Sequence, residues 1–318
     1  MIIDFHAHIY PEKIAAKAVA NICAFYNIPM GCTGTVEGLL AFKNQGGGSL
    51  PLGPQAARHT PPQTAQTPEP RPACCPTPSA GGPPPRNAPP WQGIDRFVVF
   101  SAAAAPGQVS SINDFIARTV GEHPELTGFG TLHPDFEDPA AEIERLTSLG
   151  LQGLKFHPDM QKFNIDDERM MKIYALAEGR LPIVFHTGDY RYEYSHPARL
   201  ARVLKNFPRL QAVAAHFGGW SLFDLALEHL KDQFCYFDVS SSIPYLGKKR
   251  AAELIRIYGA ERFLFGSDYP MWDPRRCLED FYALDLHDDE QELILHQNAT
   301  RILHMDTHTD THTGHAAC

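Results

Sequence analysis

The chain repeats one pattern eight times: a short hydrophobic run followed by an amphipathic stretch. The runs DRFVVFS and LPIVFHTGD are typical, and the first leads into VSSINDFIARTVGEH, whose hydrophobic residues recur at helical spacing. Strands that are hydrophobic along their whole length indicate a parallel sheet covered by helices. Eight such units over roughly 250 residues predict an α/β fold, the closed (β/α)8 or TIM barrel. A doubly wound open sheet is the alternative, but no glycine-rich phosphate loop follows the first strand.

One segment departs from this pattern. Residues 46–92 are dominated by Pro, Gly, Ser, Thr, Gln and Ala without hydrophobic periodicity, which is the composition of disordered segments. Joining residue 45 to Gly93 would give an ordinary helix–strand connection. We therefore expect a single barrel domain over residues 1–304, interrupted by 46–92 before the second strand, unless that segment is a sequence artefact. Residues 305–318, rich in His and Thr, are predicted to be a flexible tail.

Composition excludes several classes of partner. A formal net charge of −9 argues against binding to nucleic acid or to an anionic membrane surface. Seven cysteines without regular spacing predict reduced thiols and a cytoplasmic protein. The sequence shows neither a basic leader nor a long apolar segment, so we expect no membrane span. The expected partner is a small-molecule substrate. Assembly into a homo-oligomer is possible.

Polar residues gather where the predicted strands end, which is where a TIM barrel carries its chemistry. A histidine after one hydrophobic run is usually structural. Here histidines recur at five of the eight strand ends and an aspartate closes the eighth, which indicates a metal centre. The residues at these ends are His6, His8, His133, Lys155, His157, His186, His216 and Asp268.

The opening His-Ala-His is the most informative of these groups. His6 and His8 alternate with Ala7 along a strand, so they share one face about 6–7 Å apart and can bind one divalent ion. With His186 and Asp268 they would supply three nitrogens and one oxygen, a set suited to one Zn²⁺ with an open position for water. The alternative for Asp268 is an N-cap of the next helix. We expect His216 to transfer a proton or to orient the water.

The residues leave several roles open for Lys155. A buried lysine needs a partner. It could pair with Asp268 or Asp4, bind a substrate carboxylate, or be carboxylated and bridge a second metal. His157 and His133 each begin an identical His-Pro-Asp tripeptide. We expect both histidines to line the pocket.

As a set, the motifs DFHAHIY, GLKFHP, IVFHTGD, AAHFGGW, FGSDYP and QNATRIL resemble those of the amidohydrolase superfamily. The chain is most similar to the amidohydrolase-related group that includes aminocarboxymuconate-semialdehyde decarboxylase. The resemblance runs over residues 1–45 and 93–304. It implies a TIM barrel of the metal-dependent hydrolase type. It also implies a metal held by His6, His8, His186 and Asp268.

The motif GLKFHP is similar to the strand 4 lysine motif of binuclear members such as dihydroorotase, where the lysine is carboxylated. This leaves open a second metal at Lys155, His186 and His216. The decarboxylase branch usually lacks a lysine ligand.

The leading hypothesis is metal-dependent hydrolysis of a small carboxylated molecule, with Asp268 and His216 handling the proton. The alternative is non-oxidative decarboxylation at the same site, and a lesser one is a barrel that binds ligand without turnover. Lys155, Arg191 and Arg275 are candidates to line a mouth for an anion.

Overall fold

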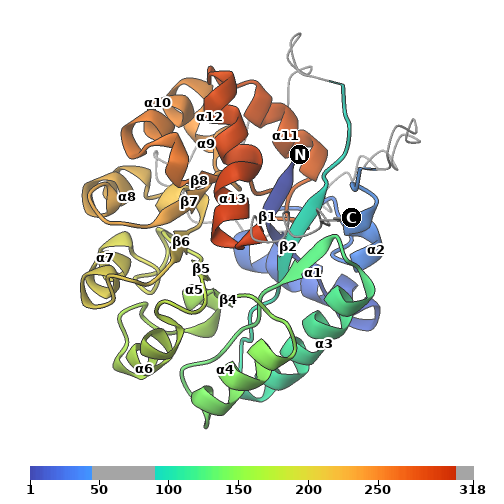
Figure 1. Ribbon diagram of the computed structural model, residues 1–318, viewed down its shortest axis with the longest axis vertical. Helices are drawn as coiled ribbons and strands as arrows, with labels where there is room; N and C mark the ends of the chain where they lie inside the picture. Colours follow the sequence, from blue (N-terminus) through green and yellow to red (C-terminus); the bar gives the residue numbers. More distant parts are fainter. Residues whose placement is uncertain (45–89, 306–318) are drawn as a thin grey trace, which may run out of the picture.

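The computed structural model describes residues 1–44 and 90–305, and it confirms the predicted TIM barrel (Figure 1). Within these residues, eight parallel strands form the wall, and each lies within one of the predicted hydrophobic runs. The strands are β1 (Ile3–His8), β2 (Arg96–Phe100), β3 (Leu126–Gly128), β4 (Leu154–Phe156), β5 (Ile183–Phe185), β6 (Ala212–Ala214), β7 (Tyr236–Asp238) and β8 (Phe263–Leu264).

Backbone hydrogen bonds close the strands into a ring. Strands β1–β3 and β4–β8 form two continuous parallel ladders. The ladders join between β3 and β4, where Gly130 N donates to Gly153 O at 2.8 Å. They join again between β8 and β1, where Phe5 N donates to Phe265 O at 2.8 Å. The second junction sets the end of the chain's last strand beside its first.

Helices surround the strands on the outside (Figure 1). Two of the described helices begin with an aspartate followed by proline: Asp138 accepts a hydrogen bond from Ala141 N, and Asp273 accepts one from Arg275 N. The helices are α1 (Glu12–Tyr26), α2 (Val36–Leu40), α3 (Val109–Glu122), α4 (Pro139–Ser148), α5 (Pro158–Gln161), α6 (Glu168–Ala177), α7 (Pro197–Asn206), α8 (Phe223–Leu230), α9 (Ile243–Leu246), α10 (Lys248–Tyr258), α11 (Pro274–Tyr282), α12 (Asp288–Glu292) and α13 (Asn298–Ile302).

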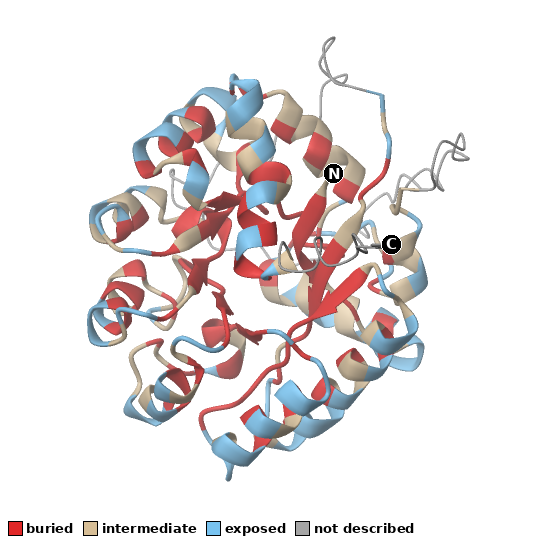
Figure 2. Ribbon diagram, in the orientation of Figure 1, coloured by how far each residue is buried: buried red, intermediate tan, exposed pale blue. Residues whose placement is uncertain are grey.

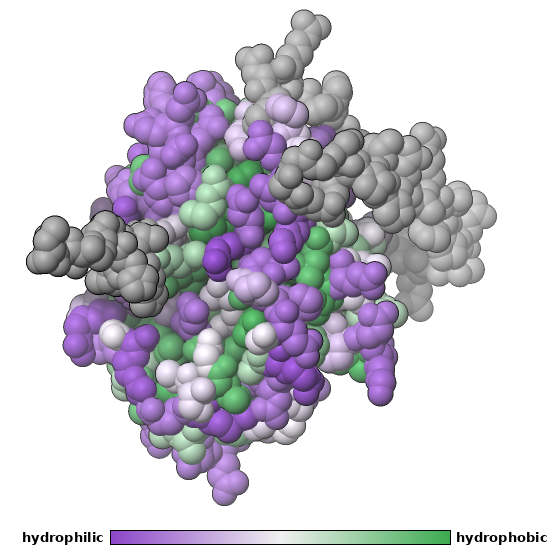
Figure 3. All heavy atoms as spheres, turned by 45° about the vertical axis from the view of Figure 1, so that its right-hand side comes forward, coloured by the Kyte–Doolittle hydropathy of each residue, from purple (hydrophilic) through white to green (hydrophobic). Residues whose placement is uncertain are grey.

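Within the described residues, two hydrophobic clusters lie on either side of the strands, because strand side chains alternate between the inside and the outside of the barrel. Along β2, Phe97 and Val99 belong to the layer between strands and helices. Val98 and Phe100 belong to the smaller cluster within the barrel. Buried residues are concentrated on the strands and the inner faces of the helices (Figure 2). On the face drawn in Figure 3, hydrophilic side chains cover most of the described surface, with hydrophobic ones between them.

Two predicted helices differ in detail. The helix expected from Thr35 onward is the short α2, because the chain turns after Leu40 and Lys43 then pairs with Ile94 as a short parallel bridge. The last predicted helix forms as α12 and α13, joined by a wider π-type turn over Leu293–Gln297. Among the described residues, no helix is long and hydrophobic enough to cross a bilayer.

Most of the 46–92 segment lies outside the described residues, as does the 305–318 tail except for Met305, so both predictions stay untested. The described residues on either side of the segment do meet. Asn44 N donates to Ile94 O at 2.8 Å, and Ile94 N donates to Phe42 O at 2.9 Å. These bonds lie before β2 begins, at the end of the barrel opposite the strands' carboxyl ends. Trp91 packs edge-on against Phe42, with 6.5 Å between ring centroids.

We expect residues 46–89 to be replaceable by a four-residue Gly-Ser linker. The paired ends need no long connection, and the shorter loop lowers the entropic cost of closure by about 2 kcal/mol. The midpoint of thermal unfolding, followed by circular dichroism, should therefore be unchanged or higher. Insoluble protein or a lower midpoint would show that the segment contributes to the fold.

Candidate metal centre

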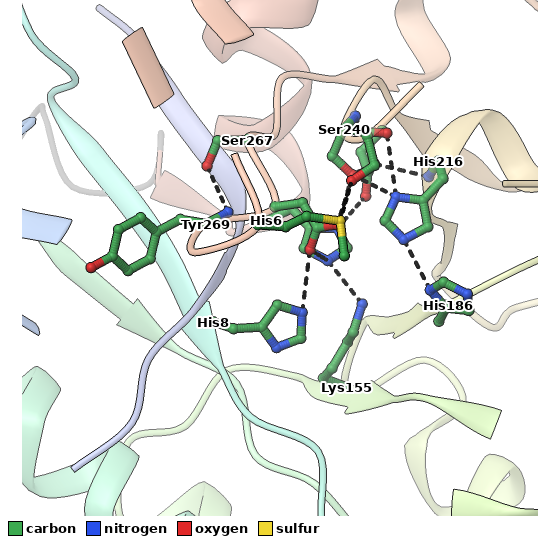
Figure 4. Close-up of polar contacts among 12 residues, drawn as sticks. His6, His8, Lys155, His186, His216, Ser240, Ser267 and Tyr269 are labelled. Atoms are coloured by element: carbon green, nitrogen blue, oxygen red, sulfur yellow. Dashed lines mark hydrogen bonds and ion pairs between the residues drawn. The ribbon is translucent and has the colours of Figure 1, made fainter. Parts of the chain in front are cut away.

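The junction between β8 and β1 brings three predicted ligand residues together. Asp268 N donates to His6 O at 2.8 Å, so the two strand ends lie side by side. Asp268 Oδ1 lies 3.4 Å from His6 Nε2 and 3.6 Å from His8 Nε2. The candidate ligand atoms of these residues all lie within 4.8 Å of one another. His6 and His8 lie close together in Figure 4.

His186, the fourth predicted ligand, faces a different set of neighbours. Its Nδ1 lies 3.0 Å from His216 Nε2 (Figure 4). Its Nε2 lies 3.6 Å from Asp159 Oδ2. Within the described residues, that Nε2 is buried and has no hydrogen-bond partner. His186 therefore falls with His157 and Asp159 in a second group of potential ligands, not with the first three residues.

Lys155 points into the barrel beside His6. Its Nζ lies 3.1 Å from His6 Nε2 and 4.8 Å from the centre of the Phe100 ring. The side chain is fully buried, and burial lowers the pKa of the ammonium group to about 8. A direct pairing with Asp4 does not form, because Asp4 accepts a hydrogen bond from Ser267 Oγ at 2.5 Å.

His157 lines the cavity and is fixed on both edges of its ring. It stacks on His186 with centroids 4.0 Å apart. Met160 N donates to its Nδ1 at 3.3 Å, so the hydrogen is on Nε2, which lies 2.6 Å from the hydroxyl of Tyr26. Tyr26 accepts that hydrogen, and its own hydroxyl hydrogen can be donated to a ligand in the cavity.

His133 does not join the cluster. Its Nδ1 accepts a hydrogen bond from Asp135 N at 3.2 Å, within its own loop. It is buried, but it is absent from the described residues that line the cavity. The predicted role of His133 in lining the pocket is therefore not what the structure shows.

Sequence reasoning missed Asp238 and Ser240 at the end of β7. Asp238 is fully buried, with Oδ2 at 2.8 Å from His6 Nδ1. Ser240 Oγ lies 2.8 Å from His216 Nδ1 (Figure 4). The run FDVSS places these two polar residues two apart at a strand end. That spacing is the same as in His-Ala-His, and it was the signal from which both residues could have been identified as site residues.

The strand ends open into a cavity of about 530 Å³. Its walls are mostly apolar and come largely from α1, α3 and the loop after β2. Among the described lining residues, the only lysine or arginine is the exposed Lys17 on α1. Arg191 is paired with Asp189 at 2.6 Å, and Arg275 stacks on Trp91, so neither lines the cavity as expected.

Burial dominates the electrostatics of the site. It lowers the pKa of His216 to about 3 and raises the pKa of Asp268 to about 7. The backbone is also unusual here. His216 and Asp268 have φ of 60°, and Ser241 has φ of 52°, in the left-handed region that side chains other than glycine rarely adopt. Strain of this kind is concentrated at functional sites.

Comparisons with known proteins agree with this architecture. The family model described as amidohydrolase matches residues 3–305. A search of curated proteins gave no significant match. An uncharacterised TIM-barrel protein from Bordetella bronchiseptica is 18% identical, with a TM-score of 0.62, over 95% of this chain and 98% of its own.

Two solved decarboxylases are also similar. The 5-carboxyvanillate decarboxylase of Sphingomonas paucimobilis is 21% identical with a TM-score of 0.54, over 66% of this chain and 79% of that one. A dihydroxybenzoic acid decarboxylase from Polaromonas, with bound manganese and the inhibitor 2-nitroresorcinol, is 16% identical with a TM-score of 0.54, over 67% and 82%. At these identities the likeness establishes a shared fold.

We expect His8→Gln to weaken metal binding by more than the roughly 10–100-fold that changes to outer-shell residues cost. His133→Gln is the matched control and should bind as the unchanged protein does. The measurement is the metal content of both variants after dialysis, determined by plasma mass spectrometry. Equal metal content in the two variants would contradict the placement of the site.

We expect the metal-free protein to lose stability as the pH falls below about 6. Buried histidines with lowered pKa values stay neutral in the folded state but gain protons when unfolded, so acid favours unfolding. Three buried carboxyls with pKa raised to about 7 oppose this, because the folded state keeps their protons. The histidines are the buried His6, His157, His186 and His216 and the partly buried His8, and the carboxyls are Asp4, Asp159 and Asp268.

Near pH 5.5 the unfolded chain should bind about 1.5 more protons than the folded one at these groups, or about 2 kcal/mol per pH unit. Urea unfolding between pH 6 and 5 measures the slope. A free energy of unfolding that stays constant or rises over this range would contradict the assignment of neutral buried histidines.

Proposed function

Because the chain belongs to the amidohydrolase family, we propose that it is a metal-dependent hydrolase of a small carboxylated molecule with an apolar body. Family and fold make it an enzyme, either a hydrolase or a carboxy-lyase. The observation that carries the hydrolase assignment is the position of Asp268. Its carboxylate lies 3.4 and 3.6 Å from the two imidazole nitrogens, so one potential base is at the metal site itself.

The residues present fit a divalent ion. His6 Nε2, His8 Nε2 and Asp268 Oδ1 supply two nitrogens and one oxygen, which suits a borderline cation. We propose His186 as a fourth ligand, because its buried Nε2 has no hydrogen-bond partner within the described residues. This nitrogen faces Asp159 in the structure, so the ring has to turn for it to join the other three ligands. The nitrogen-rich set favours Zn²⁺, and Mn²⁺ is the alternative from the Polaromonas decarboxylase. A second ion at Lys155, His186 and His216 would require carboxylated Lys155.

Asp268 is the proposed proton carrier. A divalent ion at this site would lower the pKa of a water from ~15.7 towards ~7 and polarise a carbonyl group. Ser241 Oγ donates to Asp268 Oδ2 at 2.5 Å, which leaves Oδ1 directed at His6 and His8. Burial raises the pKa of Asp268 to about 7 in the metal-free protein. We propose that this carboxylate takes a proton from the water and returns it to the leaving group.

We assign His216 a positioning role instead of proton transfer. Its Nδ1 is hydrogen bonded to Ser240, and its Nε2 to His186. Its pKa of about 3, caused mainly by burial, also disfavours proton uptake. His216 therefore holds His186 in place at the cavity wall.

The cavity suggests how the substrate lies. Its apolar walls suit an aromatic or aliphatic body. Lys17 at the outer rim offers the cation for a carboxylate, while Tyr26 can donate a hydrogen bond from the inner wall. The group to be hydrolysed then faces Asp268.

Decarboxylation is the second candidate. The apolar cavity beside the proposed metal site also suits an aromatic acid, and two solved structures of similar fold are aromatic acid decarboxylases. In this version the substrate carboxylate faces His6 and His8. Protonated Asp268 gives a proton to the carbon that loses CO₂.

We expect turnover of a carboxylated ester, lactone or amide in a screen carried out in H₂¹⁸O with Zn²⁺ or Mn²⁺ added. Mass spectrometry should find one ¹⁸O in the product, because hydrolysis adds an oxygen from water. Asp268→Asn should lower kcat at least about 100-fold, and His133→Gln should not change it. Release of CO₂ with no ¹⁸O in the product would establish decarboxylation and remove the hydrolase proposal.

A further inference from the structure

Asp238 is a buried carboxylate for which the proposed reaction has no direct use. Its Oδ1 accepts hydrogen bonds from the backbone N–H groups of His216, at 3.0 Å, and Ser240, at 3.1 Å. Its Oδ2 lies 2.8 Å from His6 Nδ1. Both oxygens are therefore occupied by donors from the chain, which leaves Asp238 poorly suited to bind a metal itself.

The contact with Asp238 fixes the tautomer of His6. A carboxylate can only accept, so His6 Nδ1 must carry the hydrogen. In a neutral imidazole the other nitrogen then has a lone pair. That nitrogen, Nε2, is the one that lies beside Asp268 and Lys155. It is the atom proposed above to bind the metal.

A second branch runs from Asp238 through Ser240 to His216. Ser240 Oγ donates to Asp238 Oδ1 at 2.5 Å, so it can only accept from His216 Nδ1 at 2.8 Å. The carbonyl oxygen of Ser240 lies 3.3 Å from the same Nδ1 and also can only accept. Both neighbours therefore place the hydrogen of His216 on Nδ1.

The order continues to His186. With its hydrogen on Nδ1, His216 has a lone pair on Nε2, which faces His186 Nδ1 at 3.0 Å. His186 must therefore donate from Nδ1, and its Nε2 has a lone pair. That nitrogen is the buried one without a hydrogen-bond partner within the described residues.

We propose that Asp238 is a positioning residue that sets the tautomers of His6, His216 and His186, so that Nε2 of His6 and Nε2 of His186 each keep a lone pair for a cation. The metal-binding consequence rests on the proposed function. The tautomers themselves do not, because they follow from hydrogen bonds within the chain. Polar partners behind metal-binding histidines commonly act in this way.

Asp238→Asn tests the proposal with little change in shape. The two backbone N–H groups would hold the amide oxygen in the place of Oδ1, so the NH₂ group would face His6 Nδ1. Nδ1 would then have to accept, which moves the hydrogen of His6 to Nε2 and blocks metal binding there. We expect metal affinity to fall about 10–100-fold. Ser240→Ala is the matched control, because it leaves the Asp238–His6 bond intact and should preserve the His6 tautomer.

The experiment is long-range ¹H–¹⁵N NMR on metal-free protein labelled with ¹⁵N-histidine, with His→Gln variants for assignment. The unchanged protein should show hydrogen on Nδ1 of all three histidines, and Asp238→Asn should move that of His6 to Nε2. Zn²⁺ titration by calorimetry then compares affinities, and circular dichroism checks folding.

Hydrogen on Nε2 of His6 in the unchanged protein would overturn the proposal even if Asp238→Asn does not fold. An unaltered His6 tautomer in a folded Asp238→Asn protein, or a shifted tautomer with unaltered Zn²⁺ affinity, would overturn it as well. If the tautomers are as expected but the protein turns over no substrate, the proposed function fails while the role of Asp238 in setting the tautomers stands.

Discussion

The site depends on the pairing of the first strand with the last. Asp268 N donates to His6 O at 2.8 Å, and His8 N donates to Tyr269 O at 2.6 Å. These backbone bonds close the barrel, and they also set the histidines from the start of the chain beside an aspartate from near its end. Closure and assembly of the site are therefore one event. A barrel that failed to close here would lose the convergence of His6, His8 and Asp268.

The sequence was sufficient for the strands and for most of the residues at their ends, because hydrophobic alternation and barrel geometry leave few alternatives. It failed where side-chain placement depends on loop length. His133 and His157 begin the same tripeptide, yet β4 ends immediately before His157 while β3 ends at Gly128, well before His133. His157 therefore reaches the cavity, whereas His133 stays within a loop.

The orientation of the histidine rings could not be predicted from the sequence either. His186 lies at a strand end as predicted, but its hydrogen bond to His216 turns its other nitrogen, Nε2, towards Asp159. Asp238 was overlooked because a lone aspartate at a strand end is common, and its importance comes from the four donors around it. Hydrogen-bond partners from separate strands are fixed by packing, which no single stretch of sequence encodes.

The left-handed backbone at His216, Ser241 and Asp268 has an evolutionary consequence. Each such residue costs on the order of 1–3 kcal/mol. Selection for stability alone would favour glycine or asparagine at these positions, and would remove the imidazole, hydroxyl and carboxylate that the rim presents. The barrel therefore carries a stability–activity trade-off localised to three turns. In descendants of this chain that lost their activity, we expect His216, Ser241 and Asp268 to be among the first residues replaced by glycine or asparagine.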